Sequence, residues 1–254
     1  MKVAIITDQH FGARNDSQIF LDFYEKFYEG TFFPTLETAG VDTVLILGDT
    51  FDRRKYVNFY SLQRARDMFF DKLQSKNIQV HMLAGNHDTY YKNTNDVNSP
   101  DLLLREYNNI HVIDKPTTID VHGLKVCMVP WICTDNYVDC MDEMEKTEAD
   151  ICMGHFEIAG FSMYRGMDSH EGFDKNVFKK FDLVLSGHYH HRSNDDHQRA
   201  VQKERKSTPA EELLQGLDVA RDTTDERTAF LVVVIGQAQS MDVRKQGDPE
   251  RVQG

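Results

Sequence analysis

The stretch VLILGDTFDR, residues 44–53, decides how the rest of the chain is interpreted. An apolar run typical of a buried strand ends at Gly48, and the carboxylate of Asp49 follows at once. A second stretch, VHMLAGNHD at residues 80–88, repeats the pattern, with polar side chains directly after a glycine. In open α/β sheets, ligands bind at the carboxyl ends of the strands. Both stretches therefore predict parallel strands that bring polar groups to one edge of a sheet, with Asp49 at the centre of a metal site.

The composition is typical of a soluble globular protein that is large enough to bury a core. The chain has 254 residues, of which 40% are hydrophobic and 28% charged, and its formal net charge is −12. No apolar run reaches the length of a membrane span and residues 1–8 are too short for a signal peptide, so we expect a cytoplasmic protein. The four cysteines form no Cys-x-x-Cys pair and are expected to be buried or reduced thiols. The acidic charge argues against a generally basic nucleic-acid binder, but acidic metal ligands also occur in nucleases.

Hydrophobic periodicity predicts alternating strands and helices over the first 190 residues. We expect strands at 1–8, 41–47, 78–84, 149–154 and 181–187, and three further strands of a second sheet at 110–113, 117–121 and 124–129. Helices are expected at 17–39, at 58–73, from residue 100 onward and at 138–148.

The character of the chain changes after about residue 194. Of its 16 Phe, 10 Tyr and 1 Trp, only Phe230 lies in residues 197–254. We therefore predict a domain over residues 1–196 and an atypical tail over 197–254. A helix near Ser207 and a strand at 230–235 are expected in the tail, and the rest is expected to be partly disordered.

Five predicted strand ends carry motifs of aspartate, asparagine and histidine. They are Asp8-x-His10, Gly48-Asp49, Gly85-Asn86-His87-Asp88, Gly154-His155 and Gly187-His188-x-His190. Oxygen and imidazole ligands without thiolate suit manganese, iron or zinc, and the oxygen content favours manganese. Residues two apart in an extended segment point the same way, so Asp8 and His10 can bind a single ion. We interpret the ordered set as a metal centre, whereas His81, His111 and His122 are expected to have no part in it.

The order of these motifs resembles the calcineurin-like metallophosphoesterase superfamily over residues 1–192. Together with the strand and helix pattern, the resemblance implies an α/β fold in four layers, with two mixed sheets between helices. It also implies two divalent metal ions per chain, most simply manganese. One ion would be held by Asp8, His10, Asp49 and His190, and the other by Asp49, Asn86, His155 and His188, so that Asp49 bridges them. Two such ions can clamp a phosphodiester and activate water as hydroxide.

The resemblance assigns further roles to residues that hold no metal. His87 would act as a general acid for the leaving oxygen, and Asp52 would orient it. Arg53 and Arg14 would bind the substrate through its phosphate oxygens.

Within the superfamily, the chain most resembles the nuclease subunit of SbcCD-type recombination and repair complexes, in its phage T4-type form. The likeness rests on TDQHFGAR at 7–14, GDTFDRR at 48–54 and MGHFEIAG at 153–160. It implies a DNA exonuclease and single-strand endonuclease that acts in recombination and double-strand-break repair, in the host cytoplasm if phage-encoded. The implied partners are DNA, an SMC-like ATPase and a second copy of the chain, bound through the helices at 58–73 and 100–107. The tail lacks the segment by which such nucleases dock the ATPase.

Two other functions stay open on the sequence alone. The same kind of site serves other esters, so a phosphatase or a small-molecule phosphodiesterase is one alternative. The acidic charge and the unusual tail are also compatible with a truncated, non-catalytic interaction module, although the complete set of motifs counts against it.

Overall fold

Two β-sheets form the centre of the molecule. The computed structural model describes residues 2–160, 162–164, 167–168, 172–189 and 231–232. One sheet contains β1 (Val3–Ile6), β2 (Thr43–Ile46), β3 (Gln79–Leu83), β4 (Ile110–Ile113) and β11 (Leu231–Val232), in the order β11-β1-β2-β3-β4. The second contains β5 (Thr117–Val121), β6 (Leu124–Val129), β7 (Ile151–His155) and β10 (Leu183–Gly187), in the order β10-β7-β6-β5. The strands β8 (Ser162–Tyr164) and β9 (Met167–Asp168) form a separate antiparallel pair.

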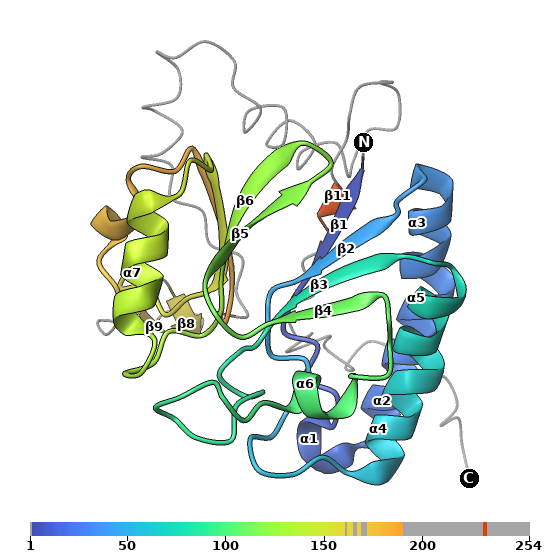
Figure 1. Cartoon of the computed structure of the whole chain (residues 1–254). Helices are drawn as coiled ribbons and strands as arrows, with labels where there is room; N and C mark the ends of the chain where they lie inside the picture. The colour runs from blue at the N-terminus through green and yellow to red at the C-terminus, as the bar shows by residue number, and fades with distance from the viewer. Residues whose placement is uncertain (1, 161, 165–166, 169–171, 190–230, 233–254) are drawn as a thin grey trace, which may run out of the picture.

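Helices cover the outer face of each sheet, so the fold has four layers (Figure 1). The helices that connect the strands of the first sheet are α1 (Ala13–Asp16), α2 (Gln18–Phe27), η1 (Tyr28–Phe32), α3 (Phe33–Ala39), α4 (Phe59–Ala65), η2 (Arg66–Phe70), α5 (Asp71–Ser75) and α6 (Ser99–Leu103). The second is covered by α7 (Tyr137–Lys146) and the 3-10 helix η3 (Lys175–Phe178). No helix in the described part of the chain is long and apolar enough to cross a membrane.

Alternation along the strands explains the layers, because successive side chains point to opposite faces of a sheet. In the first sheet, Ile6, Ile46 and Met82 are buried against the helices, whereas their neighbours Ile5 and Leu45 are buried against the second sheet. The second sheet alternates in the same way: Val126, Met128, Ile151 and Met153 face the first sheet, and Cys127, Val129 and Cys152 face the side of α7. All four cysteines are buried and free, which confirms their expected state.

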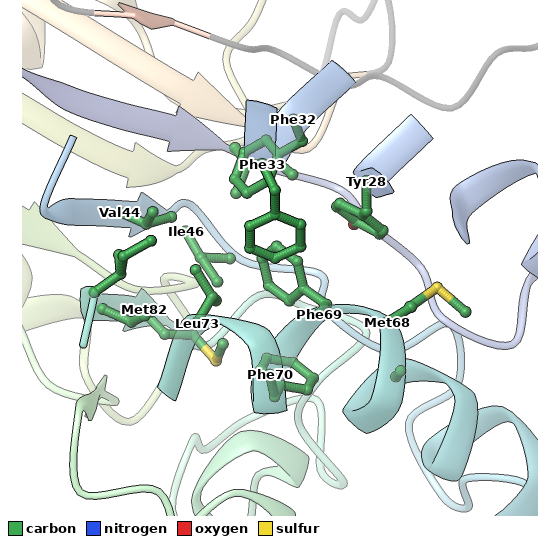
Figure 2. Packing of buried hydrophobic residues seen from close by; sticks show 14 of the residues in the cluster. Tyr28, Phe32, Phe33, Val44, Ile46, Met68, Phe69, Phe70, Leu73 and Met82 are labelled. Atoms are coloured by element: carbon green, nitrogen blue, oxygen red, sulfur yellow. The ribbon is translucent and has the colours of Figure 1, made fainter. Parts of the chain in front are cut away.

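An aromatic cluster joins the helices to the first sheet (Figure 2). The rings of Tyr28 and Phe69 lie 4.7 Å apart, and Phe32 and Phe70 pack around Phe69 at 5.7 and 5.1 Å. Such pairs add about 0.5–1.5 kcal/mol beyond the area that they bury. Most of the apolar stripe predicted for residues 58–73 is therefore core, and only its first member, Phe59, is strongly exposed.

The structure corrects one strand assignment and limits another. Residues 110–113 form a strand, but β4 pairs in parallel with β3 in the first sheet, so its assignment to the second sheet was wrong. All pairs described in the first sheet are parallel, and the second sheet contains the antiparallel pair β5–β6. In the tail, Leu231–Val232 pairs in parallel with β1, within the strand predicted at 230–235. The helix predicted near Ser207 lies outside the described residues.

Candidate metal centre

The predicted motifs meet where the parallel strands of both sheets end. Asp8, Asp49 and Asn86 follow β1, β2 and β3 in the first sheet, and His155 and His188 stand at the ends of β7 and β10 in the second. Four of the residues gathered here have a positive φ: Asp8 at 52°, His10 at 46°, Asp49 at 52° and His188 at 88°. This backbone region costs a non-glycine residue about 1–3 kcal/mol and is concentrated at functional sites. The chain accepts this cost where it turns sharply to direct these side chains inward.

Asp49 lies between two groups of possible ligands. Its Oδ2 is 3.3 Å from Nε2 of His155 and 3.6 Å from Nε2 of His10, and its Oδ1 accepts a hydrogen bond of 2.8 Å from the backbone N–H of His87. Burial would raise the pKa of Asp49, but His155, His10 and His87 together hold that pKa below its usual range. The buried carboxylate is therefore anionic and lies between the two groups. Its role as a bridging ligand, which the resemblance implies, stays a prediction.

The first group contains Asp8, His10 and Asp49. Nε2 of His10 lies 3.9 Å from Oδ1 of Asp8. The Asp8 carboxylate is held by the hydroxyl of Thr7 at 2.8 Å and by the backbone N–H of His188 at 3.0 and 3.2 Å. His190, the fourth predicted member of this group, lies outside the described residues.

The second group brings together Asp49, Asn86, His155 and His188. Nδ1 of His155 donates a hydrogen bond to the carbonyl oxygen of Leu47 at 2.8 Å, which turns its Nε2 toward Oδ1 of Asn86 at 2.9 Å. Nδ1 of His188 lies 3.0 Å from the same oxygen. Burial lowers the pKa of His155, but the Asp49 carboxylate, Asp8 and the Leu47 carbonyl together outweigh burial and raise that pKa to about 9. Oxygen and nitrogen atoms that converge in this way attract a proton when no metal is bound, and they suit a divalent cation.

The donor atoms therefore fit a metal centre. The ligand atoms of His10, Asp49 and His87 lie within 4.8 Å of one another, and so do those of Asp49, His155 and His188. These two clusters share Asp49 and consist of oxygen and imidazole nitrogen atoms, and the first contains His87 in place of Asp8. Their members are buried except for His87 and His188, which are partly buried. Such a set is suited to manganese, iron or zinc.

His87 and Asp52 adjoin the first group. The His87 ring meets the His10 ring edge to face, with centroids 4.8 Å apart. Nδ1 of His87 donates to the backbone carbonyl of Asp52 at 2.5 Å, whereas the Asp52 carboxylate lies 3.6 Å from Nδ1 of His10. Burial raises the pKa of Asp52, and the nearby His87 and Arg53 oppose that rise. Asp52 thus fixes the tautomer of His87 through its main chain, which leaves Nε2 of His87 to act on a ligand.

The two predicted phosphate-binding arginines differ in their surroundings. Arg53 lies beside Asp52, but its guanidinium also pairs with Asp16 at 3.3 Å and donates to Asn15 at 2.8 Å. Arg14 is exposed on α1. The roles of both residues as substrate contacts stay predictions.

Asp88 has a role that the sequence alone did not assign. Its side chain is fully buried and accepts hydrogen bonds from the backbone N–H groups of Thr50, Phe51 and Gly85 at 3.2, 3.0 and 2.9 Å. It therefore ties the loop that carries Asp49 to the loop that carries Asn86. Burial and the charge of Asp49 raise its pKa to about 7, although the three hydrogen bonds lower it.

Trp131 was also missed, because it follows β6 without a polar motif. Its ring centroid lies 5.3 Å from that of His188 and 6.2 Å from that of His155. Its backbone N–H donates to Ala84, and its carbonyl accepts from Asn95 at 2.8 Å. The indole is thus a fixed wall of the second group.

This position gives the centre a spectroscopic reporter, because Trp131 is the one tryptophan of the chain. Paramagnetic manganese bound beside His155 and His188 is expected to quench its fluorescence. The measurement is a titration of the metal-free protein with manganese, and Asp49→Asn serves as the control that binds less metal. Unchanged emission while two ions bind per chain would place the metals elsewhere.

The comparisons with known proteins identify the class. The family model for calcineurin-like phosphoesterases matches residues 1–192, and the chain belongs to this family. It is therefore a metal-dependent phosphodiesterase with the expected sandwich of sheets and helices. The resemblance proposed from the motifs is confirmed.

Two viral proteins are similar to the chain in sequence. The chain is 32% identical to exonuclease subunit 1 of Enterobacteria phage T4 over 235 residues, which cover 91% of this chain and 67% of that protein. It is 27% identical to a putative phosphoesterase of Invertebrate iridescent virus 6 over 194 residues, which cover 74% of this chain and 64% of that protein. The chain thus spans about two thirds of the length of each relative. The match to the phage protein covers more than the 192 residues of the family match, so it continues into the tail.

Two solved structures show weaker similarity. A protein of unknown function from Aquifex aeolicus has a TM-score of 0.35 and 18% identity, covering 60% of this chain and 77% of its own. A hypothetical protein from Thermus thermophilus has a TM-score of 0.41 and 16% identity, covering 77% of this chain and 70% of its own.

Proposed function

We propose that the chain is a manganese-dependent nuclease that hydrolyses DNA phosphodiester bonds, as an exonuclease and a single-strand endonuclease. The observation that carries the proposal is the anionic, buried Asp49 shared by two ligand groups, with His87 directly beside them. The similarity to a phage exonuclease subunit supports DNA as the substrate and a role in recombination and double-strand-break repair. It also supports action in the host cytoplasm.

Each predicted site residue has a specific task in this proposal. Asp8, His10 and Asp49, with His190, would hold one cation, and Asp49, Asn86, His155 and His188 the other. When bound, two such cations polarise the phosphodiester and lower the pKa of water. To act as the acid, His87 would carry a proton on both ring nitrogens: the Nδ1–H stays bonded to the carbonyl of Asp52, and the Nε2 proton would pass to the leaving oxygen. Arg53 and Arg14 would contact the substrate at phosphate oxygens.

Replacing His87 with alanine is expected to slow DNA cleavage about a hundredfold, the contribution of a positioned general acid. The measurement is manganese-dependent cleavage of a labelled single-stranded oligonucleotide by the wild type, by His87→Ala and by His111→Ala. His111 is an exposed histidine on β4, so its loss should not alter the rate.

His87 could also be a metal ligand, since its ring nitrogen lies within 4.8 Å of the ligand atoms of His10 and Asp49. The metal content of His87→Ala distinguishes this role from that of a general acid. An inactive variant that keeps two manganese ions supports the acid role, whereas the loss of an ion would make His87 a ligand. If the folded wild type with two ions leaves DNA intact, the nuclease proposal fails. Activity on a nucleotide monoester or a cyclic nucleotide would then favour the phosphatase or small-molecule alternative.

We further propose a homodimer and an SMC-like ATPase partner, by analogy with the nuclease complexes that the sequence resembles. The phage relative is named as a subunit of an exonuclease, which supports a partner. Phe59 at the start of α4 and Leu102 on α6 are 88% and 59% exposed, and they offer apolar surface to a second copy. A monomeric mass in solution would contradict the dimer, and separate elution of the mixed subunits would contradict the ATPase contact.

A further inference from the structure

Three exposed tyrosines lie on two loops next to the metal centre. Tyr56 is 61% exposed, and Tyr90 and Tyr91 are 40% and 51% exposed. Tyr56 follows Asp52 and Arg53 along the loop after β2, and Tyr90 and Tyr91 follow His87 and Asp88 along the loop between β3 and α6 (Figure 1). We call Tyr56, Tyr90 and Tyr91, together with Lys55 and Lys92, the tyrosine platform. None of these five residues has a role in the metal centre described above.

The two loops are held together by Arg54. Its Nη1 donates to the hydroxyl of Thr89 at 3.0 Å and to the carbonyl oxygen of Tyr91 at 3.3 Å. Lys55 places its ammonium 5.8 Å from the centre of the Tyr90 ring, and the rings of Tyr90 and Tyr91 meet edge to face at 4.7 Å. These contacts join Lys55, Tyr90 and Tyr91 across the two loops. Tyr56 is held by Arg53, whose guanidinium lies 5.0 Å from the centre of its ring and donates to its hydroxyl at 2.7 Å.

The loop between β3 and α6 is fixed at both ends. Thr89 and Asn98 form an antiparallel bridge, and the N–H of Tyr90 donates to the carbonyl oxygen of Val97 at 2.8 Å. Asn95 donates to the carbonyl oxygen of Trp131 at 2.8 Å, which ties the loop to the wall of the metal centre. The tyrosines are therefore presented by an ordered loop, and a ligand would not have to order it on binding.

The platform is also a local reversal of charge. Residues 53–58 and 89–94 contain Arg53, Arg54, Lys55 and Lys92 and no carboxylate, in a chain whose net charge is −12. Arg53 pairs with Asp16 and Asp52, so the exposed cations of the platform are Lys55 and Lys92. Exposed cations beside exposed aromatic rings are the combination by which proteins bind single-stranded nucleic acid: the rings stack on bases and the cations pair with phosphates. An acidic protein that acts on a polyanion needs such a surface close to its reactive centre.

We propose that the tyrosine platform binds single-stranded DNA that leads into the metal centre. Tyr90 and Tyr91 stack on unpaired bases, Tyr56 takes a further base, and Lys55 and Lys92 pair with the intervening phosphates. Stacking requires free base faces, so the platform selects unpaired strands over duplex. This inference rests on the proposed DNA substrate and adds the residues that recognise its unpaired strand.

The test is binding of a fluorescein-labelled oligothymidylate to the metal-free protein, measured by anisotropy, so that cleavage does not intervene. The double variant Tyr90→Ala/Tyr91→Ala is expected to bind roughly 10- to 100-fold more weakly, because each stacked base contributes substantially to affinity. Tyr137→Ala is the matched control: Tyr137 is 47% exposed on α7, over the second sheet, and its loss should leave binding unchanged.

A second variant tests the phosphate contacts separately from the tyrosines. For single strands, the slope of log K against log salt is about −0.7 per neutralised phosphate. Lys55→Gln/Lys92→Gln should therefore make that slope shallower by about 1.4. Both side chains are exposed, so these changes do not disturb the core.

The outcomes distinguish this inference from the proposed nuclease function. Two results together support the platform. The tyrosine variant binds the oligonucleotide more weakly than the wild type does, and it loses more hydrolysis of the oligonucleotide than of bis-p-nitrophenyl phosphate, a small phosphodiester. If the wild type cleaves DNA and the variants bind and cleave as it does, the platform is wrong and the nuclease function stands. If the wild type binds oligothymidylate through the tyrosines but cleaves no DNA, the platform stands and the nuclease proposal fails. Absence of any binding to single strands overturns the platform.

Discussion

Replacing Asp49 with asparagine is expected to abolish binding of the metal pair and to reduce phosphodiester hydrolysis by at least about 10⁴-fold. Asparagine keeps the shape of the side chain and can still accept the hydrogen bond from the His87 N–H. It removes the one charge that both ligand groups share. The buried His155 would also lose the carboxylate that now raises its pKa.

The measurement for Asp49→Asn combines manganese content, by elemental analysis after dialysis, with hydrolysis of a small phosphodiester. Asp67→Asn is a matched control, since it makes the same chemical change on an exposed position of η2. Thermal unfolding of both metal-free variants shows whether the fold survives. Near-normal hydrolysis by a folded Asp49→Asn variant would mean that no cation is shared at this position.

The metal centre could be predicted largely from the sequence because each of its motifs follows an apolar strand. Strands end at the same edge of a parallel sheet, so side chains distant in the chain had to converge. The structure brings Asp8, His10, Asp49, Asn86, His155 and His188 together, as expected. What the motif could not give was the contacting atom: Asp52 reaches His87 through its carbonyl oxygen rather than its carboxylate.

Other features of the structure could not be predicted, because the local sequence pattern does not determine them. β4 is a short strand of mostly apolar residues, and only its pairing with β3 shows which sheet it joins. The helix predicted over 17–39 is interrupted by a π-helical segment, η1. The hydrophobic period is only approximate, so the sequence pattern could not show this local change in hydrogen bonding. Trp131 carries no metal-binding group, so only its contacts with His155 and His188 reveal its place. Tyr90 and Tyr91 belong to no periodic segment, so only the fold shows that their loop lies beside the centre.

Replacing Gly85 with alanine is expected to lower hydrolysis at least about a thousandfold, although alanine adds only one methyl group. A Cβ on Gly85 would overlap the backbone nitrogen and Oδ1 of Asp49. The turn at Gly48 is also close, because a Cβ on Gly48 would lie 2.9 Å from the Cα of Gly85. The methyl group can fit only if the shared carboxylate moves, and a misplacement of about 1 Å can already cost 10²-fold in rate. The overpacking should also destabilise the fold by about 1–3 kcal/mol.

Gly30→Ala is the matched control for Gly85→Ala, because a Cβ there has no heavy atom within 4 Å. Gly30 lies in η1, where alanine should stabilise the helix by up to about 1 kcal/mol. Manganese content and hydrolysis are compared for both variants, with unfolding in urea as the measure of stability. Loss of metal from a Gly85→Ala protein that still unfolds cooperatively would show that the close approach of the two strand ends positions Asp49. Full metal content and activity would show that the loop can move aside, and that the position of Asp49 does not depend on the missing side chain at Gly85.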